Sequence, residues 1–264
     1  MKTDYETLLV ERPREHLVQV TLNRPAVANS LNTRMGHELT EVFTAFEVDP
    51  SLARAVVLTG AGERIFCAGA DLRERRGMSD EDWLKQHRVF ERMMRAIIDC
   101  PIPVIAAVNG AAYAGGCELT LACDFAYASK TARFALTEVT IGIMPGGAGT
   151  QTLPRIVGER RAKEIILGGE PISAADALAW GIVNRLCEPA TLLQETLDRA
   201  QRIAENAPIS VRQAKHSIHH GLQMDLRSGM MLEIEAYNRM VPTEDRREGV
   251  AAFNEKRKPR FKGR

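Results

Sequence analysis

The spacing of apolar residues changes along this chain, and that change constrains the fold more than any other sequence feature. Leu17 to Leu22 alternates like a strand, while Arg54 to Thr59 and Pro103 to Val108 are short apolar runs typical of buried strands. Between these segments, Thr33 to Val48 and a stretch beginning at Ser79 carry apolar residues at helical spacing. The order strand–helix–strand–helix–strand predicts an α/β core with short crossovers.

The second part of the chain, after about Gly158, is helical in character. Helices are predicted over residues 173–179, 191–206, 209–220, 226–239 and 244–258, with one brief strand-like segment at 182–186. We therefore predict an α/β core over residues 1–200 and a helical region over 201–264. Pro208 is the expected hinge between them.

Composition limits the partners and the cellular locations that are expected for the protein. It has 264 residues, 45% of them hydrophobic and 26% charged, with a net charge of +1, so no overall charge steers it to nucleic acid or a membrane. The N-terminal segment lacks an apolar signal core, and no apolar run approaches the length of a membrane helix. Five cysteines form no CxxC pair, which favours a reducing compartment: Cys67, Cys100, Cys117, Cys123 and Cys187. A soluble cytoplasmic protein is expected.

Several common chemistries leave no trace in the sequence. It contains no GxSxG elbow, Walker loop, HExxH motif, or GxGxxG after the first strand. The histidines all lie outside the glycine-rich segments: His16, His37, His87, His216, His219 and His220. No metal site, nucleophilic serine or nicotinamide cofactor is therefore predicted.

Two glutamates stand out because their surroundings are glycine and small apolar residues. Glu118 lies in NGAAYAGGCELTLACD and Glu138 lies in FALTEVTIGIMPGGAGTQ. Carboxylates are seldom buried without a partner or a purpose, so this setting indicates paired acid–base chemistry beside a bound ligand.

Backbone amides beside these glutamates are candidates for an oxyanion hole. Gly115 and Gly116 precede a helix predicted over 117–122, so their N–H groups would lie at the positive end of its dipole. Ala70, after Gly69, offers a second amide from a separate loop. The alternative is that these glycines serve only the close packing of a helix on a sheet.

Five ordered motifs then carry a resemblance to a known family. NRPxxxNSLN, FCAGADL, NGAAYAGGCELTLACD, ALTEVTIGIMPGGAGTQ and AAFNEKR resemble those of the crotonase, or enoyl-CoA hydratase/isomerase, superfamily. The resemblance implies an α/β spiral of ββα repeats with a C-terminal helical trimerisation region, assembled as a homotrimer or a dimer of trimers. Because both acidic positions are present, the sequence is most similar to the hydratases, with a place in fatty acid metabolism.

The same resemblance implies roles for individual residues. The amides of Ala70 and Gly115 would polarise a thioester carbonyl, Glu118 would activate water for attack at the β-carbon, and Glu138 would deliver a proton to the α-carbon. Which of the two carboxyl groups holds the proton is left open. The implied substrate is an acyl-CoA, and no separate cofactor is needed. Its coenzyme A part would contact Arg24, Ala26, Ala28, Ala68, Asp71, Leu72, Phe253 and Lys256, with the last two acting from a neighbouring subunit.

Finer features suggest one branch of the superfamily. DLRERRGMS and the C-terminal segment resemble the methylglutaconyl-CoA hydratases of leucine catabolism, whose substrate carries a distal carboxylate; Arg73, Arg75 and Arg76 are candidate cations for it. Ala114 stands where many hydratases have glycine, and alanine is expected to be tolerated there if its φ is negative.

Two rival functions remain open. One is a non-hydrating isomerase, which a single glutamate could serve. The other is RNA binding through the helix at 33–48, which its single arginine and its acidic residues disfavour.

Overall fold

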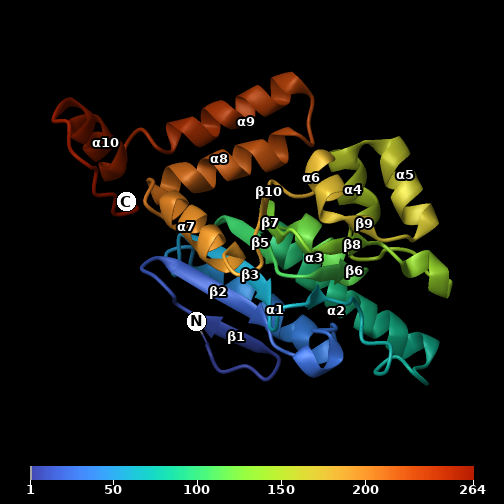
Figure 1. Cartoon of the computed structure of the whole chain (residues 1–264). Coiled ribbons are helices and arrows are strands. Elements are labelled where there is room, and N and C mark those ends of the chain that lie inside the picture. The colour runs from blue at the N-terminus through green and yellow to red at the C-terminus, as the bar shows by residue number, and fades with distance from the viewer. Residues whose placement is uncertain (1) are drawn as a thin grey trace.

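Two sheets form the centre of the computed structural model, which describes residues 2–264 (Figure 1). The larger has six strands in the order β1-β2-β3-β5-β7-β10, and the smaller has four in the order β4-β6-β8-β9. Pairing is parallel except between β1 and β2 and between β8 and β9. The strands are β1 (Leu8–Glu11), β2 (Leu17–Leu22), β3 (Ala55–Gly60), β4 (Ile65–Cys67), β5 (Val104–Val108), β6 (Ala111–Tyr113), β7 (Phe125–Ser129), β8 (Arg133–Ala135), β9 (Ile172–Ser173) and β10 (Arg185–Cys187).

Helices connect and cover the sheets. The α-helices are α1 (Thr33–Val48), α2 (Asp80–Ile98), α3 (Gly115–Ala122), α4 (Gly149–Val157), α5 (Glu159–Gly168), α6 (Ala174–Ala179), α7 (Leu192–Ala204), α8 (Pro208–Gly221), α9 (Leu226–Asn238) and α10 (Glu244–Asn254). Two short 3-10 helices are η1 (Pro25–Val27) and η2 (Glu138–Ile141).

Successive turns of the chain place one strand in each sheet and then enter a helix. β3 lies in the larger sheet, β4 in the smaller, and α2 follows; β5, β6 and α3 repeat the order. Because each turn advances by one strand in the same direction, neighbouring strands from successive turns are parallel. This is the ββα spiral that the resemblance implied.

Both faces of the larger sheet are covered, which explains the continuously apolar strands. Val56 and Leu58 on β3 belong to the main core, while Ala55 and Val57 face a second core under α7. Side chains alternate between the two faces of a strand, so the four successive positions 55–58 of β3 are all apolar.

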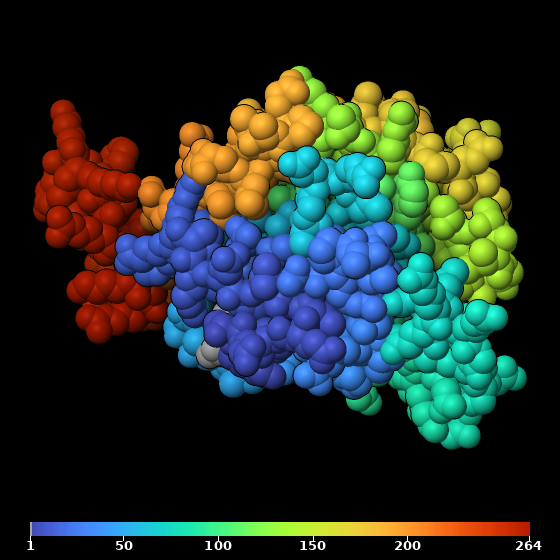
Figure 2. Space-filling model, turned by 60° about the horizontal axis from the view of Figure 1, so that its bottom comes forward, coloured from blue at the N-terminus to red at the C-terminus, as the bar shows by residue number. Residues whose placement is uncertain are grey.

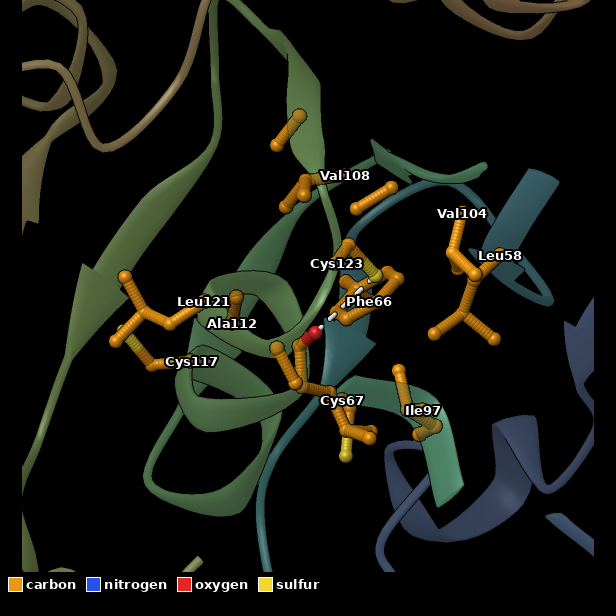
Figure 3. Close-up of a cluster of buried hydrophobic side chains, with 14 of the residues drawn as sticks. Leu58, Phe66, Cys67, Ile97, Val104, Val108, Ala112, Cys117, Leu121 and Cys123 are labelled. Atoms are coloured by element: carbon orange, nitrogen blue, oxygen red, sulfur yellow. Dashed lines mark hydrogen bonds between the residues drawn. The ribbon is translucent and has the colours of Figure 1, made fainter. Parts of the chain in front are cut away.

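Helix α3, which carries Glu118, packs closely against the core. Figure 3 shows Cys117 and Leu121 of α3 near Phe66 and Ala112 of the smaller sheet's strands. A Cβ on Gly116 would lie 2.1 Å from the carbonyl oxygen of Cys67, so only glycine permits this approach. Of Gly115 and Gly116, it is therefore Gly116 that serves the close packing of α3 on the smaller sheet.

The helix and strand predictions hold closely where local signals are strong. The predicted helix 33–48 coincides with α1, whose start is fixed by the Asn32 side chain accepting the Met35 N–H at 2.9 Å. Ser79 caps α2 in the same way. The strands predicted at 54–59 and 103–108 are each shifted by one residue at most at either end.

Three predicted boundaries were wrong. The helix expected at 244–258 ends at Asn254, the last residue of α10. The helix expected at 117–122 begins at Gly115, which places Gly115 in its first turn. The strand-like segment 182–186 contributes only its last residues to β10, which begins at Arg185. Ile182 and Val183 instead pack in the core beside α6, and their amides both donate to the carbonyl of Ala177.

The C-terminal helices lie away from the sheets. α8 and α9 run side by side and α10 projects beyond them (Figure 1). Figure 2 shows the C-terminal part in red, standing out at one end of the molecule. Pro208 is the first residue of α8, where the missing N–H costs no hydrogen bond. Asp245 clasps the chain end by accepting the amides of Lys262 (2.6 Å) and Gly263 (2.8 Å). Within residues 2–264, no helix combines the length and apolar composition needed to span a bilayer.

Candidate active site

A cavity of about 490 Å³ lies among the loop after β4, helix α2, the start of α3 and the segment from η2 to α4. The predicted catalytic and oxyanion-hole residues all line it: Ala70, Gly115, Glu118 and Glu138. The sequence separates them by up to 68 positions (138 − 70), and the spiral brings them together because Ala70 follows β4, Gly115 and Glu118 follow β6, and Glu138 follows β8, three neighbouring strands of the smaller sheet. The remaining lining is mainly apolar.

Ala70 and Gly115 lie close together in the cavity wall. A Cβ placed on Gly115 would lie 3.9 Å from the Ala70 nitrogen, so the two loops approach closely. Within residues 2–264, neither nitrogen has a hydrogen-bond acceptor, since Leu31 pairs with the loop through Gly69 and Asp71 instead. Gly115 also opens α3, so its free N–H lies at the positive end of the helix. Two unpaired donors at such a place can stabilise a developing oxyanion.

Ala114 does not meet the condition under which alanine was expected to be tolerated here. Its φ is +49° and its ψ is −122°, a region that favours glycine, and not the negative φ that this condition names. The turn from β6 into α3 requires this backbone, because the Ala114 amide donates to the carbonyl of Ala135 at 2.8 Å while the next amide faces the cavity. The chain therefore holds local strain beside Gly115.

Glu118 is buried, with 4% of its surface exposed, and its carboxylate is anchored. Oε1 accepts hydrogen bonds from the amides of Gly147 and Gly149, both at 2.8 Å. Gly149 is the first residue of α4, so this oxygen lies at a helix N-terminus, which favours negative charge. Burial raises the pKa of Glu118, and these two hydrogen bonds act against that rise.

Glu138 is equally buried, at 6% exposed, but its carboxyl group is not anchored in this way. Its Oε2 has no hydrogen-bond partner within residues 2–264. Burial, with a smaller contribution from the nearby charge of Glu118, raises its pKa to about 7. A buried polar atom without a partner is costly, and at a cavity wall it marks a place for a ligand or a water molecule.

The cavity thus combines a pair of unequal carboxyl groups with two free amides. A comparison of the sequence with protein families finds a match to the enoyl-CoA hydratase/isomerase family over residues 12–264. The chain belongs to this family. The suspected crotonase superfamily is thereby confirmed.

Individual relatives agree with this assignment. An enoyl-CoA hydratase of Bacillus anthracis superposes with a TM-score of 0.96 and is 44% identical, covering 98% of this chain and all of that one. A short-chain-enoyl-CoA hydratase of Clostridium acetobutylicum is 41% identical over 90% of this chain and 91% of its own. A mitochondrial enoyl-CoA hydratase of Pongo abelii is 42% identical over 92% of this chain and 82% of its own.

Sequence reasoning about this family member missed His87. Its imidazole lines the cavity, and a Cβ on Gly146 would lie 2.5 Å from its Cε1. His87 was set aside because it lies outside the glycine-rich segments. Its position on the apolar face of α2, one turn before Phe90, was the available signal. Within residues 2–264, no His, Cys, Asp and Glu side chains gather in a group of three or more that could hold a metal ion.

The expected coenzyme A contacts fall into two groups. Ala26 and Ala28 lie in and after η1, beside the loop that holds Ala68 and Leu72; the Ala68 amide donates to the Ala28 carbonyl at 3.1 Å. Ala68 and Leu72 also line the cavity. Arg24 is committed within the protein, since its Nη1 lies 2.9 Å from Asp71 and donates to the Ser30 carbonyl at 2.6 Å.

The second group lies apart from the cavity. Phe253 lies on α10, and Lys256 is the second residue after the end of this helix. Both residues are exposed. Phe253 is 84% exposed, which is unusual for a large aromatic residue. In one chain, α10 lies at the opposite end of the molecule from α2 (Figure 1).

Proposed function

We propose that the protein is an enoyl-CoA hydratase that adds water across the 2,3 double bond of an enoyl-CoA thioester, using Glu118 and Glu138. The observation that carries this proposal is the meeting of two buried carboxyl groups and two unpaired amides in one largely apolar cavity. The names of the relatives at about 40% identity support the same reaction class.

The environments of the two glutamates support different roles for them. Two amide donors favour the ionised form of Glu118, which suits it to accept a proton from water as the water oxygen bonds to the β-carbon. Glu138 has an oxygen, Oε2, without a partner, and burial outweighs the effect of its own backbone amide and raises its pKa to about 7, so it can hold the proton that passes to the α-carbon. A proton exchange between the two groups through the next water molecule restores the starting state.

The amides of Ala70 and Gly115 would accept the thioester oxygen. The β-carbon is electrophilic only if negative charge can collect on that oxygen. Amides already fixed in place stabilise this charge without reorganising, an effect worth about 3 to 4 kcal/mol for one donor in other enzymes. The apolar lining would exclude bulk water and strengthen the interaction.

Coenzyme A is treated as part of the substrate, so no separate cofactor is proposed. The exposed loops around Ala26, Ala68 and Leu72 would border its adenine and pantetheine. The exposure of Phe253 supports a contact with the nucleotide bound to a neighbouring subunit, in a trimer or a dimer of trimers. Arg24 would contact a phosphate only by giving up its ion pair with Asp71.

A narrower substrate, 3-methylglutaconyl-CoA, is proposed from the resemblance to that branch. Of the three arginines suggested for its carboxylate, Arg73 and Arg76 are exposed and do not line the cavity, whereas Arg75 is buried in its wall. Leucine catabolism and a cytoplasmic location remain predictions.

The decisive experiment compares two reactions in one absorbance assay. Crotonyl-CoA should lose its conjugated thioester absorbance on hydration, with a rate that falls sharply in Glu118→Gln. A 3-enoyl-CoA would gain this absorbance if the protein were chiefly an isomerase. Rapid isomerisation without hydration would overturn the proposal.

A further inference from the structure

Arg75 differs from the other arginines of its loop because its side chain is buried against helix α2. Only 9% of Arg75 is exposed, whereas its neighbours Arg73 and Arg76 lie at the surface. The guanidinium carbon lies 4.2 Å from the ring centre of Trp83 and 5.6 Å from that of Phe90. Aromatic faces hold a cation in this arrangement and restrict its movement.

One hydrogen bond fixes the orientation of the guanidinium. Its Nε donates to Oε1 of Gln86 at 2.8 Å, and Gln86 in turn donates to Glu74 at 2.8 Å and to Thr33 at 2.9 Å. Glu74 also accepts the Thr33 amide at 2.9 Å. The carboxylate nearest in sequence is therefore engaged by other donors, and it does not form an ion pair with Arg75.

The outer nitrogens of Arg75 are left free. Within residues 2–264, neither Nη1 nor Nη2 has a hydrogen-bond acceptor or an acidic group within ion-pair distance, and the residue lines the cavity. Burial accordingly lowers the pKa of Arg75. A desolvated cation with unused donors is costly unless a ligand supplies the missing anion.

Helix α2 gives the distance between this cation and the carboxyl pair. Gln86 holds Arg75, whereas Met94, two turns later, adjoins Glu118: a Cβ on Gly147 would lie 2.9 Å from the Met94 methyl carbon and 2.7 Å from Glu118 Oε2. The eight residue steps from Gln86 to Met94 rise roughly 12 Å along the helix axis.

We infer that Arg75 is a specificity-determining residue that binds a carboxylate at the far end of the acyl group, and so selects enoyl-CoA thioesters of dicarboxylic acids. This inference rests on the proposed function of the same cavity. A guanidinium fork with both outer nitrogens free matches a carboxylate in two-point hydrogen bonding. A neutral acyl chain would leave the cation unpaired, which selects against it.

The kinetic test compares glutaconyl-CoA, which ends in a carboxylate, with the neutral 2-hexenoyl-CoA. The wild-type protein should favour glutaconyl-CoA by at least about tenfold in kcat/KM. Arg75→Met should lower kcat/KM about 30- to 100-fold for glutaconyl-CoA and change it no more than about threefold for 2-hexenoyl-CoA. The matched control Arg76→Met, an exposed cation on the same loop, should leave both values within about twofold.

A binding measurement on the wild-type protein covers the case in which Arg75→Met fails to fold. As a competing ligand, glutaryl-CoA should bind with higher affinity than hexanoyl-CoA. Added salt should lower the affinity for glutaryl-CoA more than the affinity for hexanoyl-CoA. Equal affinity for the two, or an equal loss on both substrates in Arg75→Met, would overturn the inference. If the wild-type protein hydrates neither substrate, the proposed function fails, and the two affinities alone then decide the role of Arg75.

Discussion

Glu118 and Glu138 are the same residue type, buried to the same degree in the same cavity, yet their surroundings differ. Glu118 lies on α3 beside the start of α4, and Glu138 is the first residue of η2. Glu118 receives two amide hydrogen bonds, while Glu138 has an oxygen with no partner. Burial alone raises both pKa values, and the amides at the start of α4 provide the difference between an anchored base and an acid that can hold a proton.

Removing either carboxyl group should have the largest effect. Glu118→Gln and Glu138→Gln should each lower kcat by roughly a thousandfold or more, because each takes away one proton transfer. Coenzyme A affinity should hardly change, since neither glutamate is expected to contact the nucleotide. Steady-state kinetics with crotonyl-CoA and competition by free coenzyme A measure the two effects. Near-wild-type turnover in either variant would refute the two-carboxylate scheme.

The double substitution sharpens the comparison. If the glutamates act as one unit, Glu118→Gln combined with Glu138→Gln should cost little more than the worse single change. Additive losses would mean that the two groups act in independent steps.

The raised pKa of Glu138 should appear in the pH dependence of stability. Between its ordinary value of 4.5 and about 7, the folded state binds a proton that the unfolded state has lost. Its contribution is therefore fully present below pH 4.5 and is lost as pH rises to 7, by at most about 3 kcal/mol. Urea unfolding from pH 4.5 to 8 should show this slope in the wild-type protein and a smaller one in Glu138→Gln. Identical slopes would place the Glu138 pKa near its ordinary value.

The amide cradle of Glu118 can be disturbed without removing the carboxylate. In Gly147→Ala, the new Cβ would lie 2.7 Å from Glu118 Oε2, so the side chain must shift. We expect kcat to fall about ten- to fiftyfold, because misplacing a reacting group by about 1 Å is costly. Gly168→Ala serves as the matched control, since nothing lies within 4 Å of its added Cβ. Equal activity of the two variants would show that the cradle does not position Glu118.

Relieving the strain at Ala114 should give the smallest effect. In Ala114→Gly, a residue that tolerates a φ of +49° stands directly before α3, the helix that carries Glu118. Part of the gain is offset by the greater flexibility of glycine in the unfolded chain, so stability should rise by about 1 kcal/mol. Thermal unfolding measures the change, with Ala112→Gly in the adjoining strand β6 expected to destabilise. A loss of stability in Ala114→Gly would mean that the backbone there is not strained.

Local signals made much of the fold predictable. Asn32 and Ser79 fix the starts of α1 and α2 through their own side chains, and these starts were identified correctly. The short strands β4, β6, β8 and β9 were not predicted, because two or three residues carry no periodicity and depend on pairing with distant segments.

The site was predictable to the extent that it uses unusual residues. Glu118 and Glu138 are conspicuous among glycines, and the motifs around Ala70 and Gly115 suggested the amides. His87 and the burial of Arg75 were not foreseen. Arg75 lies in a polar stretch, and His87 carried only the weak signal of its place on the apolar face of α2; the packing of the loop after β4 against α2 draws both into the cavity wall.

The sequence by itself indicated the α/β core and singled out the two glutamates, because capping residues, apolar runs and unusual neighbours act over short distances. Its motifs carried the resemblance that implied the family and the ββα spiral. The tertiary structure alone decided that Glu118 accepts two amides while Glu138 keeps a free oxygen, and that Ala114 has a positive φ. It also decided that Arg75 is the cation in the cavity wall. Hydrogen bonding and desolvation depend on neighbours contributed by separate turns of the spiral, and local sequence does not specify how those neighbours meet.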